Sequence, residues 1–189
     1  MALKEASRKI GNKGVFIQAN ITNLPLAENC VDSVVSLHTI YHVPSEEQFS
    51  AFRELHRVLK PRATAAVVYS WDRQSPLMAV TMFPLRVLRW PLRLLRQLKA
   101  RPTKPRERSN GPTLYFFCHR RKSLEEELRK LCDFDLMVWR SVNVLFLRVY
   151  VHPWLFGKQL LSLVFSLEET FPRFFGKVGA YPLIVMHKR

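Results

Sequence analysis

The sequence is short of glycine, of cysteine and of long apolar runs. It holds 6 Gly and 3 Cys in 189 residues. The cysteines (Cys30, Cys118 and Cys132) form no C-x-x-C pair, which argues against a disulfide framework and against a zinc or other metal site. No apolar run reaches about 18 residues, so a transmembrane helix is not supported, and the N-terminus has no secretory signal. We expect one domain in a reducing, cytoplasmic setting.

Acidic side chains are also scarce, and the excess positive charge lies in one segment. The chain has 30 Lys plus Arg against 15 Asp plus Glu, a formal net charge of +15. Residues 1–72 carry a net +1 and residues 123–189 a net +2, whereas residues 73–122 carry a net +12. The sequence therefore predicts a near-neutral body with a basic insertion. Such a local patch indicates an anionic partner or a membrane surface.

Apolar runs and helical periodicities alternate along the chain and predict an α/β fold. Strands are expected at 15–19, 31–36, 63–71, 135–142 and 181–186, and helices at 3–10, 45–60, 123–131 and 153–170. Apolar strands separated by a helix are typical of a β-α-β unit in a parallel sheet. The last two strands fit an antiparallel hairpin that closes the edge of that sheet.

Polar residues at two expected helix starts fit N-caps. Ser45 is followed by Gln48, and Ser123 by Glu126, which is the spacing of a capping box. Pro61 is expected to end the first of these helices, because proline lacks the N–H that a helix needs.

Residues 84–97 repeat a short pattern, PLRVLRW followed by PLRLLRQ. Its arginines recur at a 3-4-3 spacing, with leucines at the same spacing beside them, which predicts a basic amphipathic helix bent at Pro91. The four arginines are Arg86, Arg89, Arg93 and Arg96. Residues 99–112 are polar, basic and proline-rich, and are expected to form an exposed loop.

Three blocks between residues 15 and 71 follow one another: QANITNLPLAENCVDSVVS, SLHTIYHV and ELHRVLKPRA. The first has a Leu-Pro-apolar step before a strand, the second a strand end followed by a His, and the third a Glu-x-x-Arg-Val-Leu-Lys-Pro turn. In this order and spacing they resemble the class I S-adenosylmethionine (SAM)-dependent methyltransferases of the type 11 group. The resemblance implies a Rossmann-like sheet, SAM as cofactor and methyl transfer as the reaction.

The chain departs from that family in its first part. It lacks the glycine-rich turn after the family's first strand and the acidic residue that ends the second strand. The family pattern places Met1 in the helix after that second strand, so we expect an N-terminally truncated sheet without its first two strands. In the family's strand order, 3-2-1-4-5-7-6, this leaves strands 3 and 4 either directly paired or unpaired. Arg62-Ala63 replaces the family's Gly-Gly, which makes a left-handed turn at this position less favourable.

We expect three parts on this basis. Residues 1–72 form a partial cofactor-binding α/β half. Residues 73–122 form a basic insertion or lid, and residues 123–189 form a C-terminal part that completes the sheet.

The resemblance assigns five candidate cofactor-binding residues: Asn20, Ile21, Ser36, Leu37 and His38. Asn20 stands where the family has the acidic residue that reads the adenine amino group, and its amide oxygen can accept that hydrogen bond without charge assistance. Ile21 would flank the adenine. Residues 36–38 end a strand at the carboxyl edge, where open α/β sheets bind ligands. Asn20 equally fits a loop residue that caps a turn.

Tyr41 and His42 follow that strand, where the family places side chains that face the substrate. The resemblance makes them candidate catalytic residues, because a His can orient an acceptor or take its proton. A His held at a helix start, without a catalytic role, is the competing interpretation. Many methyl transfers need mainly the alignment of nucleophile and methyl group, so the lack of an evident base does not exclude the reaction.

Residues 84–108 have three interpretations: a lid over the acceptor site, an element on an anionic membrane surface, or a nucleic-acid contact. The first two are compatible and indicate a lipid-like or quinone-like acceptor and a cytoplasmic protein that is peripheral at a membrane. We rank nucleic acid last, because the sequence shows no pattern of stacking aromatics among basic residues. The hypotheses are thus a methyltransferase for a small or amphiphilic acceptor, a catalytically inactive truncated remnant, or a membrane-surface binding module.

If residues 84–108 bind a membrane surface, the chain co-sediments with anionic vesicles, and changing Arg86, Arg89, Arg93 and Arg96 to Gln releases it. Each cation near an anionic surface contributes about 1 kcal/mol, so we expect the partition coefficient to fall by at least about 100-fold. Binding that is unchanged in the fourfold variant contradicts the membrane interpretation.

Overall fold

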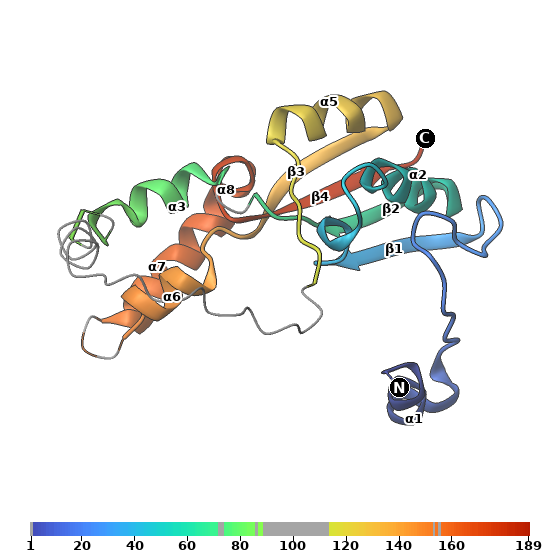
Figure 1. Cartoon of the computed structure of the whole chain (residues 1–189), viewed down its shortest axis with the longest axis horizontal. Coiled ribbons are helices and arrows are strands. Elements are labelled where there is room, and N and C mark those ends of the chain that lie inside the picture. Colours follow the sequence, from blue (N-terminus) through green and yellow to red (C-terminus); the bar gives the residue numbers. More distant parts are fainter. Residues whose placement is uncertain (1, 72–73, 86, 89–113, 153, 155) are drawn as a thin grey trace, which may run out of the picture.

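The apolar runs pair into one four-stranded sheet with helices packed on it (Figure 1). This computed structural model describes residues 2–71, 74–85, 87–88, 114–152, 154 and 156–189. The strands are β1 (Val31–Leu37), β2 (Leu59–Val68), β3 (Asp133–Arg140) and β4 (Tyr181–His187). The helices are α1 (Ala2–Ile10), α2 (Gln48–Val58), α3 (Pro76–Thr81), α5 (Arg121–Leu131), α6 (Val144–Tyr150), α7 (Gly157–Thr170) and α8 (Pro172–Val178), with short 3-10 turns η1 (Gly11–Lys13) and η2 (Ile40–His42).

The strand order of the sheet is β1-β2-β4-β3. β1 and β2 run parallel and are joined by α2, which confirms the expected β-α-β unit. β4 is antiparallel to both of its neighbours. The expected antiparallel pairing of the last two strands is therefore confirmed, but β4 lies inside the sheet and β3 forms its edge.

One face of the sheet builds the main core. Side chains alternate between the two faces of a strand, and those on this face are buried together with the apolar side of α2 and α5. The core includes Phe52, Leu55, Ala65, Val67, Leu124, Leu128, Leu136, Ile184 and Met186. This cluster holds β1, β2 and β4 in register beneath α2.

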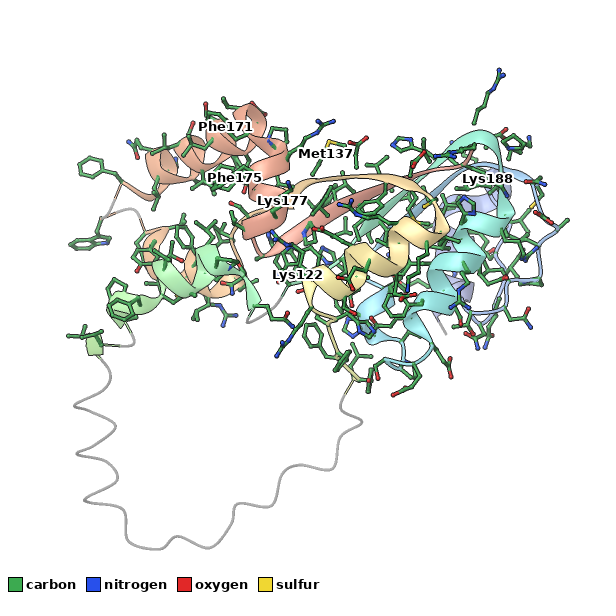
Figure 2. The ribbon with its side chains drawn as sticks, turned by 90° about the horizontal axis from the view of Figure 1, so that it is seen from above. Lys122, Met137, Phe171, Phe175, Lys177 and Lys188 are labelled. Atoms are coloured by element: carbon green, nitrogen blue, oxygen red, sulfur yellow. The ribbon has the colours of Figure 1, made fainter. Side chains whose placement is uncertain are left out.

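The opposite face is covered by α8 near β3 and is open near β1. Gly176 in α8 allows this close packing, because a Cβ there would lie 2.5 Å from the backbone carbonyl of Met137. Figure 2 shows Met137 beside the α8 residues Phe175 and Lys177. On β1, by contrast, Val35 is 67% exposed and Leu37 48% exposed.

The strand expected at residues 15–19 does not form. This segment is extended and exposed, and it leads from α1 to the loop before β1 without joining the sheet (Figure 1). In the family's order, strand 3 pairs with strand 2, which has no counterpart in the described sheet. The backbone groups of residues 15–19 therefore have no neighbouring strand to bind. The sequence left two outcomes for this segment, pairing with β1 or no pairing, and the second is observed.

Both expected capping boxes are wrong. α2 begins at Gln48 with Glu47 as N-cap, and the Ser45 hydroxyl donates to the Glu46 carboxylate at 2.7 Å instead. Gln48 is fully buried in a tertiary hydrogen-bond network. α5 begins two residues earlier than expected, so Ser123 lies inside the helix. At α2, the Gln48 network outweighs the local capping pattern.

Pro61 does not end α2 but lies within β2. The helix stops at Val58, and the β1–β2 register shifts between the Val31–Leu59 and Ser33–Thr64 pairs, which makes room for the extra β2 residues. Proline is tolerated at such irregularities because they need no ladder N–H. Arg62 adopts a positive φ of 66°, so the left-handed turn forms there without glycine.

The remaining differences are in the last third and in the basic insertion. α6 was not expected, and the helix expected at 153–170 is α7 from Gly157 onward, followed by the separate helix α8. Residues 83–85 and 87–88 are helical, as the periodicity predicts. The rest of residues 84–108, including the four arginines, lies outside the described residues. Among the described residues, no helix is long and apolar enough to span a membrane.

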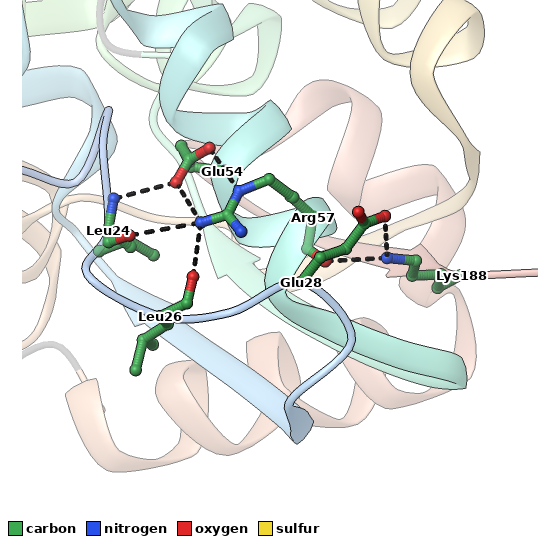
Figure 3. Close-up of polar contacts among 6 residues, drawn as sticks. All are labelled: Leu24, Leu26, Glu28, Glu54, Arg57 and Lys188. Carbon is green, nitrogen blue, oxygen red and sulfur yellow. Dashed lines mark hydrogen bonds and ion pairs between the residues drawn. The ribbon is translucent and has the colours of Figure 1, made fainter.

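Arg57 on α2 fixes the loop that leads into β1 (Figure 3). Its guanidinium donates to both carboxylate oxygens of Glu54 at 2.8 and 2.9 Å, and to the carbonyl oxygens of Leu24 and Leu26 at 3.3 and 2.9 Å. Glu54 also accepts from the Leu24 N–H at 2.9 Å. Burial of this pair is only partial, but the planar fork matches four acceptors at once, which a lysine cannot do.

We expect Arg57→Lys to lower the free energy of unfolding by about 2 kcal/mol, the range for hydrogen bonds to charged groups, and Arg57→Ala to lower it further. Urea unfolding followed by circular dichroism measures the change. The control is Lys60→Gln, which breaks the exposed Lys60–Asp32 pair of 2.8 Å and is expected to cost less than about 1 kcal/mol. Equal effects of the two changes contradict this role of Arg57.

Candidate functional site at the carboxyl edge of the sheet

Side chains from three strands meet where β1 and β2 end. Because β4 is antiparallel to β2, its first residue, Tyr181, lies at this carboxyl edge. β3 ends there as well, with Arg140 paired in register with Tyr181. His38 follows β1 directly and adopts a positive φ of 56°, which is uncommon for a residue with a side chain. This conformation turns the chain sharply into η2.

His38, Tyr41 and Tyr181 form a contact cluster at this edge. The Tyr41 hydroxyl and His38 Nδ1 are joined by a 2.8 Å hydrogen bond. The His38 ring also packs edge-on against Tyr181, with 5.2 Å between ring centroids. Burial, together with the nearby Tyr181, raises the pKa of the Tyr41 hydroxyl to about 12. Burial, Arg140 and His42 lower the pKa of His38, so at pH 7 the cluster carries its positive charge on Arg140.

A returning segment, residues 114–120, covers Tyr41 and His42. The Phe117 N–H donates to the Tyr41 carbonyl at 2.9 Å, and the Phe116 ring lies 5.1 Å from the Tyr41 ring. His42 Nδ1 donates to the Tyr115 carbonyl at 2.7 Å. This bond places the proton of neutral His42 on Nδ1 and leaves Nε2 as the acceptor. The returning segment thus sets the tautomer of neutral His42.

A buried polar network holds the returning segment in place. The amide nitrogen of Gln48 donates to the carbonyls of Val43 and Phe117, both at 3.0 Å. The Gln48 amide oxygen accepts from the Tyr69 hydroxyl at 2.6 Å, and that hydroxyl accepts from the His119 N–H at 3.0 Å. Since every polar atom of the Gln48 side chain is hydrogen-bonded, its burial leaves no polar atom without a partner.

The expected cofactor-binding residues are only partly brought together. Leu37 is exposed beside His38 at the end of β1, but the side chain of Ser36 points into the core, where its hydroxyl is buried and has no hydrogen-bond partner. Asn20 hydrogen-bonds within its own turn: its amide oxygen accepts from the Thr22 N–H at 3.1 Å. Ile21 packs against the main core.

Comparison with known proteins relates this geometry to a protein family. Residues 1–67 match the methyltransferase domain family. The match covers about a third of the 189-residue chain. Its sheet order corresponds to strands 4-5-7-6 of that family's order. The described sheet therefore lacks counterparts of strands 3, 2 and 1, which is one strand more than the sequence led us to expect.

Solved structures show the same fold for the domain. A SAM-dependent methyltransferase from Archaeoglobus fulgidus aligns with a TM-score of 0.50 at 10% identity, covering 98% of this chain and 73% of that one. A protein from Pyrococcus horikoshii OT3 aligns with a TM-score of 0.51 at 14% identity, covering 98% and 65%. The cyclase SpnF, at 17% identity and a TM-score of 0.47, is covered over 61% of its length, and this chain over 97%. Comparison with curated protein sequences finds no match.

Two of the expected cofactor-binding residues keep groups that suit the adenine of SAM. The amide oxygen of Asn20 keeps a second lone pair for an adenine amino group, and exposed Leu37 offers an apolar surface for a ring. Among the described residues, none is placed to bind the methionine part of SAM. Of the glycines that the structure describes, only Gly11 has a positive φ, and it begins η1, directly after α1. Figure 1 shows α1 away from the sheet.

Sequence reasoning missed Arg140, Tyr181 and the Gln48–Tyr69 pair. Arg140 and Tyr181 belong to strands whose place in the sheet no local pattern encodes. Gln48 carried a signal, since an amide amid the apolar residues of a helix points to a buried partner, but its spacing from Ser45 favoured a cap instead.

We expect Gln48→Leu to lower the free energy of unfolding by about 2–3 kcal/mol, because it removes the side-chain donor to two carbonyls and leaves the Tyr69 O–H without its acceptor. Hydrogen exchange at the Phe117 and His119 amides is expected to accelerate in parallel. Gln74→Leu is the matched control, since the Gln74 amide is exposed and donates only to the Cys118 carbonyl at 3.3 Å. Unchanged exchange at both amides in Gln48→Leu contradicts this role of the network.

Proposed function

We propose that this chain acts as a SAM-dependent methyltransferase on a small or amphiphilic acceptor that binds at the carboxyl edge. The observation that carries the proposal is the His38–Tyr41–Tyr181 cluster. His38 and Tyr41 follow β1, in the part of the chain that matches the methyltransferase domain family, whereas Tyr181 comes from β4, outside that match. Open α/β sheets bind their ligands at this edge.

When bound, SAM supplies an electrophilic methyl group on a sulfonium. The chain's own residues then have two tasks. The cluster of half-buried aromatic rings excludes water from one side of the acceptor and limits its orientations, which favours alignment. His42 Nε2 is free to accept a proton from the acceptor, because Nδ1 is held by the Tyr115 carbonyl.

The alternative is an inactive remnant, and two observations favour it. No described glycine at the carboxyl edge adopts a left-handed turn, and the Asn20 amide oxygen is already bonded within its own turn. The membrane-surface module, which is the other alternative, depends on residues 84–108, most of which lie outside the described residues.

Isothermal titration of the 189-residue chain with SAM separates the enzyme from the remnant. As an enzyme, the chain is expected to bind SAM saturably with a Kd below about 1 mM, that is, by at least about 4 kcal/mol. We expect Leu37→Asp to weaken this binding by about tenfold or more, because it places a charge where the adenine ring would lie. Val35→Asp, also exposed and on the same face of β1, is the control and is expected to leave the Kd within about twofold.

No heat of binding at SAM concentrations up to about 5 mM contradicts the proposal and supports the remnant, because a Kd weaker than that corresponds to only about 3 kcal/mol. An equal loss of binding in Leu37→Asp and Val35→Asp places the cofactor elsewhere than at the carboxyl edge.

A further inference from the structure

Arg140 is a half-buried cation that makes no ion pair within the described part of the chain. Its Nε is buried and has no hydrogen-bond partner. The guanidinium carbon lies 4.8 Å from the centroid of the Tyr181 ring, which is a cation–π contact. Two arginines that contact the other end of β3 are paired: Arg173 with Asp135 at 3.1 Å and Arg189 with Asp133 at 2.7 Å.

An unpaired guanidinium at a partly buried position is costly, because burial removes water from a charge and from donors that then lack partners. A carboxylate offsets that cost best, since its two oxygens match the planar fork of the guanidinium. Arg140 is the one cation that the described residues place at this cluster, and a single positive charge suits a monoanion better than a phosphate dianion.

The neighbours of Arg140 indicate the rest of the ligand. Tyr181 presents its ring face to Arg140 and lies at 89° to the His38 ring, which in turn holds the Tyr41 hydroxyl. The next residue after Arg140, Ser141, has a fully buried hydroxyl without a hydrogen-bond partner. Aromatic surface beside an unpaired cation suits a flat, apolar molecule with one acidic group.

We propose that Arg140 binds the carboxylate of the methyl acceptor, so that the acceptor is an aromatic or similarly planar carboxylic acid. This inference rests on the proposed function, because it names the substrate class for the same edge. It assigns Arg140 to recognition of the acceptor and leaves proton transfer to His42.

Titration of the full chain with benzoate and with benzamide, without SAM, tests this inference. The two probes have the same ring and differ in charge. We expect benzoate to bind at least about tenfold more tightly than benzamide, and Arg140→Gln to abolish that difference. Arg140→Lys keeps the charge but not the fork, and is expected to retain part of the preference. Arg173→Gln removes a surface cation near the other end of β3 and is expected to leave the benzoate Kd within about twofold.

Several outcomes overturn the inference: equal binding of benzoate and benzamide, a benzoate Kd unchanged in Arg140→Gln, or tighter binding of phenyl phosphate than of benzoate. If Arg140→Gln does not fold, the wild-type comparison and Arg140→Lys still decide. The titration contains no SAM, so the two proposals can fail separately. If the chain binds benzoate through Arg140 but does not bind SAM, the proposed function is contradicted and the role of Arg140 is not.

Discussion

The arrangement of the carboxyl edge depends on the hydrogen bonds that Arg57 makes to the loop before β1. One side chain on α2 bonds Glu54 and two loop carbonyls. The carbonyl of Arg57 accepts from the Asn29 N–H at 3.1 Å and from the Lys188 ammonium at 2.9 Å. The helix, the start of β1 and the chain after β4 are therefore tied at a single residue. The position of β1 against α2 sets where His38 emerges at the other end of the strand.

The Glu-x-x-Arg pattern of the sequence thus has a physical meaning that the sequence alone did not reveal. A spacing of three residues brings Glu54 and Arg57 onto one helix face, and this much is predictable. That the guanidinium also reaches Leu24 and Leu26, more than 30 positions earlier, depends on the tertiary fold. The β-α-β unit and the helices with strong periodicity were predictable for the same reason, because their signals are local. The cap expected at Ser45 failed because the long-range contacts of Gln48 decided that helix start, and the cap expected at Ser123 failed because α5 begins two residues earlier.

The candidate site shows the same difference between local signals and tertiary contacts even more clearly. Tyr41, His38 and His42 lie close to β1 in sequence, and the family resemblance pointed to them. Arg140 and Tyr181 reach the same edge only because β4 inserts between β2 and β3. Gln48 shows a further limit: its side-chain amide makes three hydrogen bonds that join residues 43, 69 and 117, and no spacing rule contains such a set. The returning segment depends on this amide, and through it so does the tautomer of His42.

The open edge of β1 has a consequence for the molecule in solution. Within the described sheet, β1 pairs only with β2, so one row of its backbone groups faces outward beside exposed Val35 and Leu37. Such an edge is a template for strand addition between molecules, which leads to aggregation. The net charge of +15 opposes that encounter, because like-charged molecules repel at distances up to about 10 Å in 0.1 M salt. Colloidal stability therefore depends on ionic strength: concentrated salt screens the repulsion and leaves the strand edge unprotected.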